Sequence, residues 1–266
     1  MGGATKRAVL LGLVAMLGCT SPGPRSADTG RGTAQSMLRV GVSPDAPPIA
    51  FMRDGRIVGV EPDLAQALSD QSRRPLALIP MEFNALIPAL LNGRIDAIMS
   101  GMSATPARQV RVAFADSYMR GGLLPACRRS EASKYPTRES ILSMGGNVGV
   151  RSGSTAESWA QANLTYANVA AYPSITDAAR EMSQGRLDLI ISDAPQVAWA
   201  VSEHAGTLQV LRVLLTQEDI AWAFRREDTG LRNAANAALA SMRQDGRLHA
   251  ILQQWIPYLD QLERSR

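Results

Sequence analysis

Residues that could carry out catalysis are sparse in this sequence. The chain of 266 residues has only two histidines, His204 and His249, which lie in separate helical segments without a partner at the spacing of metal ligands. It has no Gly-x-Ser-x-Gly nucleophile motif and no glycine-rich phosphate loop. The run Ser152-Gly153-Ser154 is better explained as a tight turn before a helix. We therefore expect no catalytic residues, no metal and no other cofactor.

A repeated segment gives the first indication of a binding site. Residues 93–100, Gly-Arg-Ile-Asp-Ala-Ile-Met-Ser, reappear as residues 185–192, Gly-Arg-Leu-Asp-Leu-Ile-Ile-Ser. In both copies a helical pattern precedes the glycine, which suits a left-handed helix end, and a buried strand follows. One copy would mean little, because this is a frequent helix-to-strand connection, but two copies predict two similar lobes. Ligands bind beyond the carboxyl ends of such strands, so Ser100 and Ser192 are expected at the two rims of one cleft.

The elements that would position these rims alternate between strand and helix. The alternation of β-branched residues in 38–42 predicts a strand, and short apolar strands separate the later helices. Helices are expected at 63–71, 83–92, 155–163, 175–184, 196–203 and 230–244. This order predicts an α/β protein in which mostly parallel sheets are flanked by helices.

Composition supports a folded α/β body and argues against nucleic-acid binding. Hydrophobic residues make up 45% of the chain and aromatic residues 5%, so aliphatic side chains must fill the core. The net charge is +4, but the arginines are scattered and form no block that would follow a phosphate backbone.

The amino terminus has the pattern of an export signal. Lys6 and Arg7 precede an apolar run, 8–17, that is too short to span a bilayer. The following Met-Leu-Gly-Cys resembles the bacterial lipoprotein cleavage box and would make Cys19 the lipidated first residue of the mature chain, although Met16 replaces the usual Leu. An ordinary cleaved signal is the alternative. Residues 20–36 have the composition of a flexible tether, and with Cys19 lipidated, Cys127 would have no disulfide partner.

From Leu38 to Tyr258 the sequence resembles the extracellular solute-binding proteins of family 3, the polar amino-acid receptors of bacterial ABC importers. The segments that carry this resemblance are 38–42 with Pro47-Pro48, 59–65, 86–90, 96–103 with Thr105 and Arg108, 114–118, 148–150, 152–155, 193–195 and 245–248 with Trp255. The resemblance implies a two-lobed Venus-flytrap fold that closes around an α-amino acid. It also implies a membrane-embedded ABC permease as partner.

The resemblance assigns a role to individual residues of the cleft. Arg108 would clamp the ligand carboxylate with two charge-assisted hydrogen bonds, and Asp193 would accept the α-ammonium. Further contacts would come from Phe83, Ser100, Gly101, Ser103, Ser154 and Thr155. Each assignment has a structural alternative: Arg108 as a surface arginine like Arg111, Asp193 as a helix cap, and Phe83 as a core residue.

Departures from the family pattern bear on the ligand side chain. Ser43 and Ala46 stand where many relatives have an acidic and an aromatic residue, and Ile49 replaces a usual aromatic. Without a carboxylate at Ser43, a cationic side chain would be poorly compensated. Arg151 lies where the family often contacts the ligand side chain. An amide or acidic side chain is therefore favoured over a cationic one.

An enzyme of the same fold remains an alternative. Segments 99–101, 118–120 and 160–164, with Trp255 and Tyr258, are similar to cyclohexadienyl dehydratase, which acts on prephenate or arogenate. Such an enzyme needs a general acid, and Gln196 stands where that group has a glutamate. Because an amide cannot serve as that acid, we expect a binding protein.

The expected molecule is an extracytoplasmic, lipid-anchored monomer, located in the periplasm or on the outer face of the cell membrane. Its first lobe would comprise 37–119 plus 220–260, and its second 120–219. The chain would cross between the lobes near 118–122 and 214–220, with Gly121 and Gly122 suited to a hinge.

Overall fold

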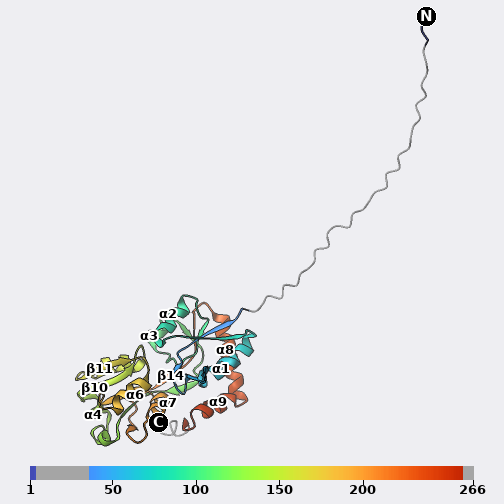
Figure 1. Cartoon of the computed structure of the whole chain (residues 1–266). Helices are drawn as coiled ribbons and strands as arrows, with labels where there is room; N and C mark the ends of the chain where they lie inside the picture. The colour runs from blue at the N-terminus through green and yellow to red at the C-terminus, as the bar shows by residue number, and fades with distance from the viewer. Residues whose placement is uncertain (4–35, 260–266) are drawn as a thin grey trace. The chain divides into compact units, whose positions relative to one another are not determined.

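The computed structural model describes residues 1–3 and 36–259 (Figure 1). Of the predicted export signal and tether, residues 4–35, which include Cys19, lie outside the described residues. Residues 36–259 belong to one compact unit. Within the described ranges, no helix is long and apolar enough to cross a membrane.

The first lobe is built around a five-stranded sheet in the order β5-β1-β6-β15-β7. Its strands are β1 (Leu38–Val42), β5 (Leu76–Pro80), β6 (Ala97–Ile98), β7 (Ala113–Phe114) and β15 (Ala223–Phe224). β1 pairs in parallel with β5 and β6, whereas β15 pairs antiparallel with β6 and β7. Four strands therefore share one direction and β15 runs against them.

The second lobe repeats this arrangement with the order β11-β10-β12-β9-β13. Its strands are β9 (Leu123–Arg128), β10 (Gly146–Arg151), β11 (Ala167–Tyr172), β12 (Leu189–Asp193) and β13 (Leu208–Val210). β10 pairs in parallel with β11 and β12, and β9 pairs antiparallel with β12 and β13. In each sheet the reversed strand is the first one that the chain forms after crossing from the other lobe. The predicted two-lobed α/β fold with mostly parallel sheets is confirmed.

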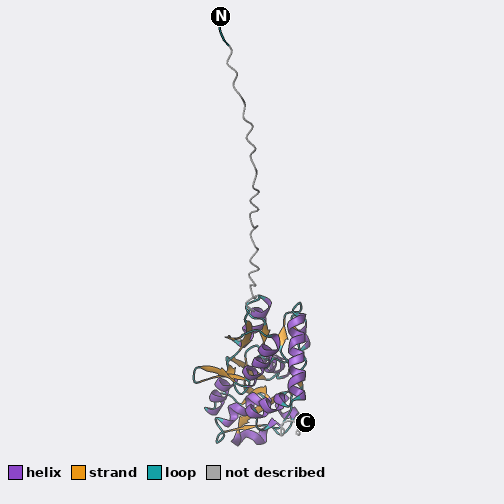
Figure 2. Ribbon diagram, turned by 90° about the vertical axis from the view of Figure 1, so that its right-hand side faces the viewer, coloured by secondary structure: helices purple, strands orange, loops and turns teal. Residues whose placement is uncertain are grey.

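Helices flank the strands (Figure 2). The elements are α1 (Val60–Ser72), η1 (Phe83–Ala85), α2 (Leu86–Leu91), α3 (Pro106–Gln109), η2 (Arg129–Lys134), α4 (Arg138–Leu142), α5 (Thr155–Asn163), α6 (Ile175–Ser183), α7 (Ala194–Ser202), α8 (Thr229–Gln244) and α9 (Arg247–Trp255). α5 has the predicted bounds, and the predicted helix 83–92 begins as the short 3-10 helix η1.

Alternating residues of the strands pack into separate cores on the two faces of each sheet. In the first lobe Ala97 packs in the cluster that includes residues of α1, α8 and α9, whereas Ile98 packs with α2. In the second lobe Leu189 and Ile191 pack in the cluster that includes residues of α5, and Ile190 packs with α6 and α7. Both sheets are therefore covered on both faces, which leaves the ends of the strands as the places for polar groups.

The sequence repeat folds into the same local structure twice. Gly93 has φ +69° and Gly185 has φ +82°, the left-handed conformation that the pattern predicts. After α2, the N–H of Gly93 donates to Leu90 O at 3.1 Å and that of Arg94 to Ala89 O at 2.9 Å. The second copy has the same pair of hydrogen bonds, from Gly185 to Met182 and from Arg186 to Glu181. Both helices thus end in a Schellman motif.

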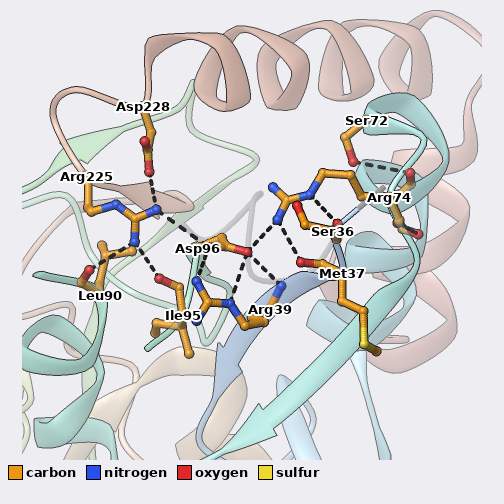
Figure 3. A network of polar contacts seen from close by, with 11 residues as sticks. Ser36, Met37, Arg39, Ser72, Arg74, Leu90, Ile95, Asp96, Arg225 and Asp228 are labelled. Carbon is orange, nitrogen blue, oxygen red and sulfur yellow. Dashed lines mark hydrogen bonds and ion pairs between the residues drawn. The ribbon is translucent and has the colours of Figure 1, made fainter. Parts of the chain in front are cut away.

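The aspartate of each repeat ties its own strand to the neighbouring one. Asp96 Oδ2 accepts the backbone N–H of Arg39 at 3.1 Å, and Asp188 Oδ2 accepts that of Asn147 at 2.8 Å. Asp96 also forms ion pairs with three arginines, Arg39 at 2.6 Å, Arg74 at 2.7 Å and Arg225 at 3.5 Å (Figure 3). Asp188 has one such arginine, Arg128, at 3.2 Å.

The reversed strands supply an arginine at equivalent places in the two lobes. Arg225 Nη1, just after β15, donates to Leu90 O at 3.2 Å and to Ile95 O at 2.7 Å. Arg128 Nη1, at the end of β9, donates to the matching carbonyls of Met182 and Leu187. The Gly-Arg-x-Asp repeat is therefore explained as a structural unit that fixes the helix end against the sheet.

Two short strands lie where the chain passes between the lobes. β8 (Met119–Gly121) pairs antiparallel with β14 (Glu218–Ile220). Both lie in the segments predicted as crossings. We retain the predicted lobe boundaries and the hinge role of Gly121 and Gly122 as proposals.

A small antiparallel sheet of three strands follows β1 in the first lobe. Its strands are β2 (Asp45–Ala46), β3 (Ala50–Arg53) and β4 (Arg56–Val58).

Candidate ligand-binding site between the two lobes

Polar residues gather where the strands of the first lobe end. Ser43 follows β1 and Ser100 follows β6, and both are buried. The backbone N–H of Ser43 donates to Ser100 Oγ at 2.9 Å, and Ser43 Oγ donates to Asp45 Oδ1 at 3.0 Å. Ser100 therefore lies at the rim that the repeat predicts, and its hydroxyl supports the loop after β1.

Arg151, at the end of β10, reaches from the second lobe to this cluster. Its Nη2 donates to Ser43 Oγ at 2.6 Å and to Asp45 Oδ1. Its guanidinium carbon lies 4.4 Å from the ring centroid of Phe83, and its buried Nε has no partner among the described residues. Burial lowers the pKa of Arg151, and the carboxylates of Asp45 and Asp193 oppose that shift.

Arg108 enters the cleft from α3 in the first lobe. The hydroxyl of Thr105 accepts the backbone N–H of Arg108 at 3.3 Å and so caps this short helix. Arg108 Nη1 donates to Ser103 O at 3.0 Å, and Nη2 crosses to Gly153 O of the second lobe at 3.1 Å. Arg108 is partly buried, unlike the exposed surface arginine Arg111. Burial lowers the pKa of Arg108, which Asp193 and Glu218 oppose.

Asp193 lies at the end of β12 and at the N-cap position of α7. Its side chain makes no capping hydrogen bond, and its buried Oδ1 has no partner in the part of the chain that the structure describes. The pKa of Asp193 is raised to about 7, mainly by burial and then by the like charge of Glu218, whereas Arg108 and Arg151 oppose the rise. The capping alternative does not account for this carboxylate.

The turn before α5 brings backbone and hydroxyl groups to the same region. Ser154 is the N-cap of α5: its Oγ accepts the N–H of Glu157 at 3.2 Å and donates to Arg151 O at 2.6 Å. Thr155 Oγ1 donates to Glu218 Oε2 at 2.9 Å. A groove of about 630 Å³ is lined by Thr155 and Glu218 together with Phe83, Arg108, Gly153 and other residues.

Gly101 and Ile49 form a tightly packed wall of the first lobe. Gly101 has φ +65°, and a Cβ on it would lie 2.9 Å from Ile49 Cγ2 and 3.8 Å from Gln196 Nε2. The loop after Ser100 therefore faces α7 of the second lobe, as the two-rim prediction requires. Ser192 Oγ donates to Gln196 Oε1 at 3.0 Å, and both residues are buried.

The sequence analysis missed a buried carboxylate, Glu61, that supports the loop after Ser100. Glu61 Oε1 accepts the N–H of Gly101 at 2.7 Å and the hydroxyl of Tyr118 at 2.8 Å, while Oε2 accepts Trp222 Nε1–H at 2.9 Å. Burial raises the pKa of Glu61 to about 7, and the three hydrogen bonds oppose that shift. Its signal was an acidic residue in the first turn of α1, two residues after Gly59.

Comparison with known proteins identifies the architecture. A sequence profile of the bacterial extracellular solute-binding proteins, family 3, matches residues 38–258. The chain belongs to this family. The L-cystine-binding protein TcyJ of Escherichia coli K12 is 26% identical over 82% of this chain and 82% of its own length.

Two further relatives of this family 3 protein concern the alternative function. The cyclohexadienyl dehydratase of Pseudomonas aeruginosa is 29% identical over 69% of both chains. The crystal structure of AncCDT-1, described as an ancestral amino acid-binding protein and a precursor of cyclohexadienyl dehydratase, matches with a TM-score of 0.78. It is 31% identical and covers 83% of this chain and 96% of its own.

Of the residues assigned by the resemblance, Phe83, Arg108 and Thr155 line the groove, and Arg151 contacts both Phe83 and Ser43. Their role in ligand binding remains a prediction. Asp45 and Glu218 were missed, because they lie 106 and 63 positions in the sequence from their partners Arg151 and Thr155, and no pattern indicates that the fold brings them together. Within the described ranges, no group of three or more His, Cys, Asp or Glu residues could hold a metal ion.

Proposed function

We propose that this protein captures a small α-amino acid between its two lobes. The observation that carries the proposal is the Asp193 side chain, whose buried Oδ1 has no hydrogen-bond partner among the described residues and whose charge interacts with the guanidinium of Arg108. A buried carboxylate oxygen without a partner is costly, and a ligand ammonium would offset that cost. Arg108, which engages two carbonyl oxygens, has further N–H groups for a ligand carboxylate.

The two charges complement a zwitterion across the closed cleft. Arg108 belongs to the first lobe and Asp193 to the second, so a ligand that binds both favours the closed arrangement. Ser100, Ser103 and Thr155 would supply additional hydrogen bonds, and Phe83 an apolar surface. This is the arrangement that a receptor needs if loaded and empty forms are to differ in shape.

We further propose that the protein serves an ABC importer as an extracytoplasmic lipoprotein. Membership of the solute-binding family supports the transport role, and the cleavage box ending at Cys19 supports the anchor. Mass spectrometry of the membrane fraction should find a diacylglyceryl group on Cys19. An unmodified soluble chain would contradict the anchor.

A second candidate is cyclohexadienyl dehydratase activity, because one relative carries that name and Asp193 has a pKa near neutrality. Against it stands Gln196, whose amide oxygen accepts a hydrogen bond from Ser192 and whose amide cannot act as a general acid. Incubation with prephenate and with arogenate, followed by ultraviolet detection of product, distinguishes the two functions.

The binding proposal is tested by isothermal titration with the twenty amino acids. Arg108→Lys should weaken binding of the best ligand by about 10- to 100-fold, because the planar pair of donors is lost. Asp193→Asn should weaken it comparably. Arg56→Lys, at an exposed arginine of β4 that does not line the groove, is the matched control and should leave the affinity unchanged. If a folded wild-type protein binds no amino acid, or if the Arg108 and Arg56 variants behave alike, the proposal is wrong.

A further inference from the structure

The cleft contains the groups that suit a cationic side chain. Phe83 offers an aromatic face, Asp45 a carboxylate and Ser43 a hydroxyl, and these three come together beside Arg151. An aromatic face with a nearby carboxylate is the environment in which proteins bind guanidinium and ammonium groups. We infer that the protein's own Arg151 occupies this subsite and thereby excludes amino acids with a cationic side chain.

Arg151 contacts all three of these groups. Its guanidinium lies 4.4 Å from the Phe83 ring centroid, and its Nη2 bonds both Ser43 Oγ and Asp45 Oδ1. The Arg151 side chain is only 3% exposed, compared with 34% for the Asp45 side chain. Arg151 is therefore held inside the cleft, where its guanidinium takes the place beside Phe83, Ser43 and Asp45 that a ligand cation would need.

Electrostatics strengthens this exclusion. Arg108 also lies over the Phe83 ring, at 5.5 Å, and the charge of Arg151 lowers the pKa of Arg108, so the two guanidinium groups repel each other. A third positive charge from a ligand would meet both. In contrast, the buried Nε–H of Arg151 lacks an acceptor, which an amide or carboxylate oxygen of a ligand side chain would provide.

This inference rests on the proposed function for the identity of the ligand, but the subsite itself can be tested without an amino acid. The probe is ethylguanidinium, which carries the end group of an arginine side chain. Arg151→Ala removes the guanidinium that occupies the subsite and leaves Phe83, Asp45 and Ser43 in place. Arg151→Leu fills the same space without a charge or donors and is the matched control. Arg151→Ser is a second opening variant, in case Arg151→Ala does not fold.

Binding of ethylguanidinium is measured by thermal shift and titration. We expect the opening variants to bind it at least about tenfold more tightly than the wild type and Arg151→Leu. Adding Asp45→Asn to an opening variant should remove most of the gain. The inference is overturned if a folded opening variant binds ethylguanidinium no better than Arg151→Leu does.

L-Arginine and L-glutamine, titrated into the same proteins, separate this inference from the proposed function. The wild type should prefer glutamine, and the opening variants should gain at least about tenfold in affinity for arginine. Preferential binding of arginine by the wild type would overturn the inference. If ethylguanidinium binds the opening variants but no amino acid binds any protein, the subsite stands and the proposed function fails.

Discussion

Asp193 determines how ligand binding should respond to pH. Its pKa is raised to about 7 by burial and then by the like charge of Glu218, which together outweigh the opposing charges of Arg108 and Arg151. A ligand ammonium favours the ionised form, so binding lowers this pKa and releases a proton near neutral pH. Below pH 7 the carboxyl is protonated before binding, and the ligand must displace that proton.

The affinity for an amino acid should therefore fall as the pH is lowered from 8 to 5, by up to about tenfold for each pH unit below 7. Titration in buffers of different ionisation enthalpy should detect proton release near pH 7. Asp193→Asn should bind weakly and without this pH dependence. If Asp193→Asn keeps the full pH dependence of the wild type, another group is responsible.

At the scale of single residues, sequence reasoning brought together the groups that lie in family motifs and missed those that depend on tertiary contact. Arg108, Phe83 and Asp193 were predicted because the family resemblance assigns these positions to the ligand. The partner of Arg151 was not found: the sequence shows no carboxylate at Ser43, and Asp45, two residues later, supplies one that Arg151 occupies. Only the three-dimensional structure shows that pairing.

At the scale of elements, the repeated Gly-Arg-x-Asp segment provides two equivalent aspartates, Asp96 and Asp188. They allow a measurement of how burial and the number of arginine partners change the contribution of an ion pair to the free energy of unfolding. The Asp96 side chain is 7% exposed and contacts three arginines, whereas that of Asp188 is 32% exposed and contacts one. Burial opposes ionisation of Asp96, but hydrogen bonds and the charges of Arg39 and Arg74 outweigh it and lower the pKa. Its stabilising contribution is therefore present above the unfolded pKa and is lost as the pH falls through the folded pKa.

Asp96→Asn should lower the free energy of unfolding by about 2–4 kcal/mol at neutral pH, because it removes the carboxylate that Arg39 and Arg74 share and leaves Arg225 only its ion pair with Asp228. This loss is smaller than the loss expected when one partner of a fully buried ion pair is removed, because the arginines are partly exposed. Asp188→Asn should cost about 1 kcal/mol. Urea unfolding of both variants at neutral pH measures the difference, which should shrink near pH 3. Equal losses in the two lobes would contradict this account.

Element types were predictable where periodicity extended over several turns, as in α5 and α8. The short helices α3 and α4 lack enough turns to show a period, and the direction of the reversed strands β9 and β15 has no signal in the sequence. Their direction follows from the topology, because each is the first strand that its sheet gains after the chain crosses between lobes. The repeat predicted two similar lobes but could not predict this reversal.

At the scale of the whole molecule, contacts across the cleft couple the two lobes at separate places. Besides the contacts of Arg108 and Arg151, Tyr258 Oη donates to Pro195 O at 3.1 Å, and the rings of Phe51 and Trp199 lie 5.3 Å apart between centroids. One proposed crossing also connects directly to the candidate site, because Gly122 O accepts the N–H of Ala194, the residue after Asp193, at 3.0 Å.

Gly122 therefore offers a test of whether the crossing sets the position of Asp193. A Cβ at Gly122 would lie 2.2 Å from the backbone oxygen of Thr216 in the other crossing, so Gly122→Ala must push the two crossings apart. At Gly121 the nearest atoms belong to the flexible side chain of Ile220, at 3.2 Å. Gly122→Ala should weaken amino-acid binding by about tenfold or more, because strain of this kind costs about 1–3 kcal/mol.

The matched variant Gly121→Ala should change the affinity much less, since a side chain can move where a backbone oxygen cannot. Small-angle scattering with saturating ligand should show a larger radius of gyration for Gly122→Ala than for the wild type and Gly121→Ala, because the strained crossing resists full closure. If Gly122→Ala loses affinity yet closes as fully as the wild type, the displacement acts on Asp193 alone. Unchanged affinity in both variants would mean that this crossing positions neither the carboxylate nor the lobes.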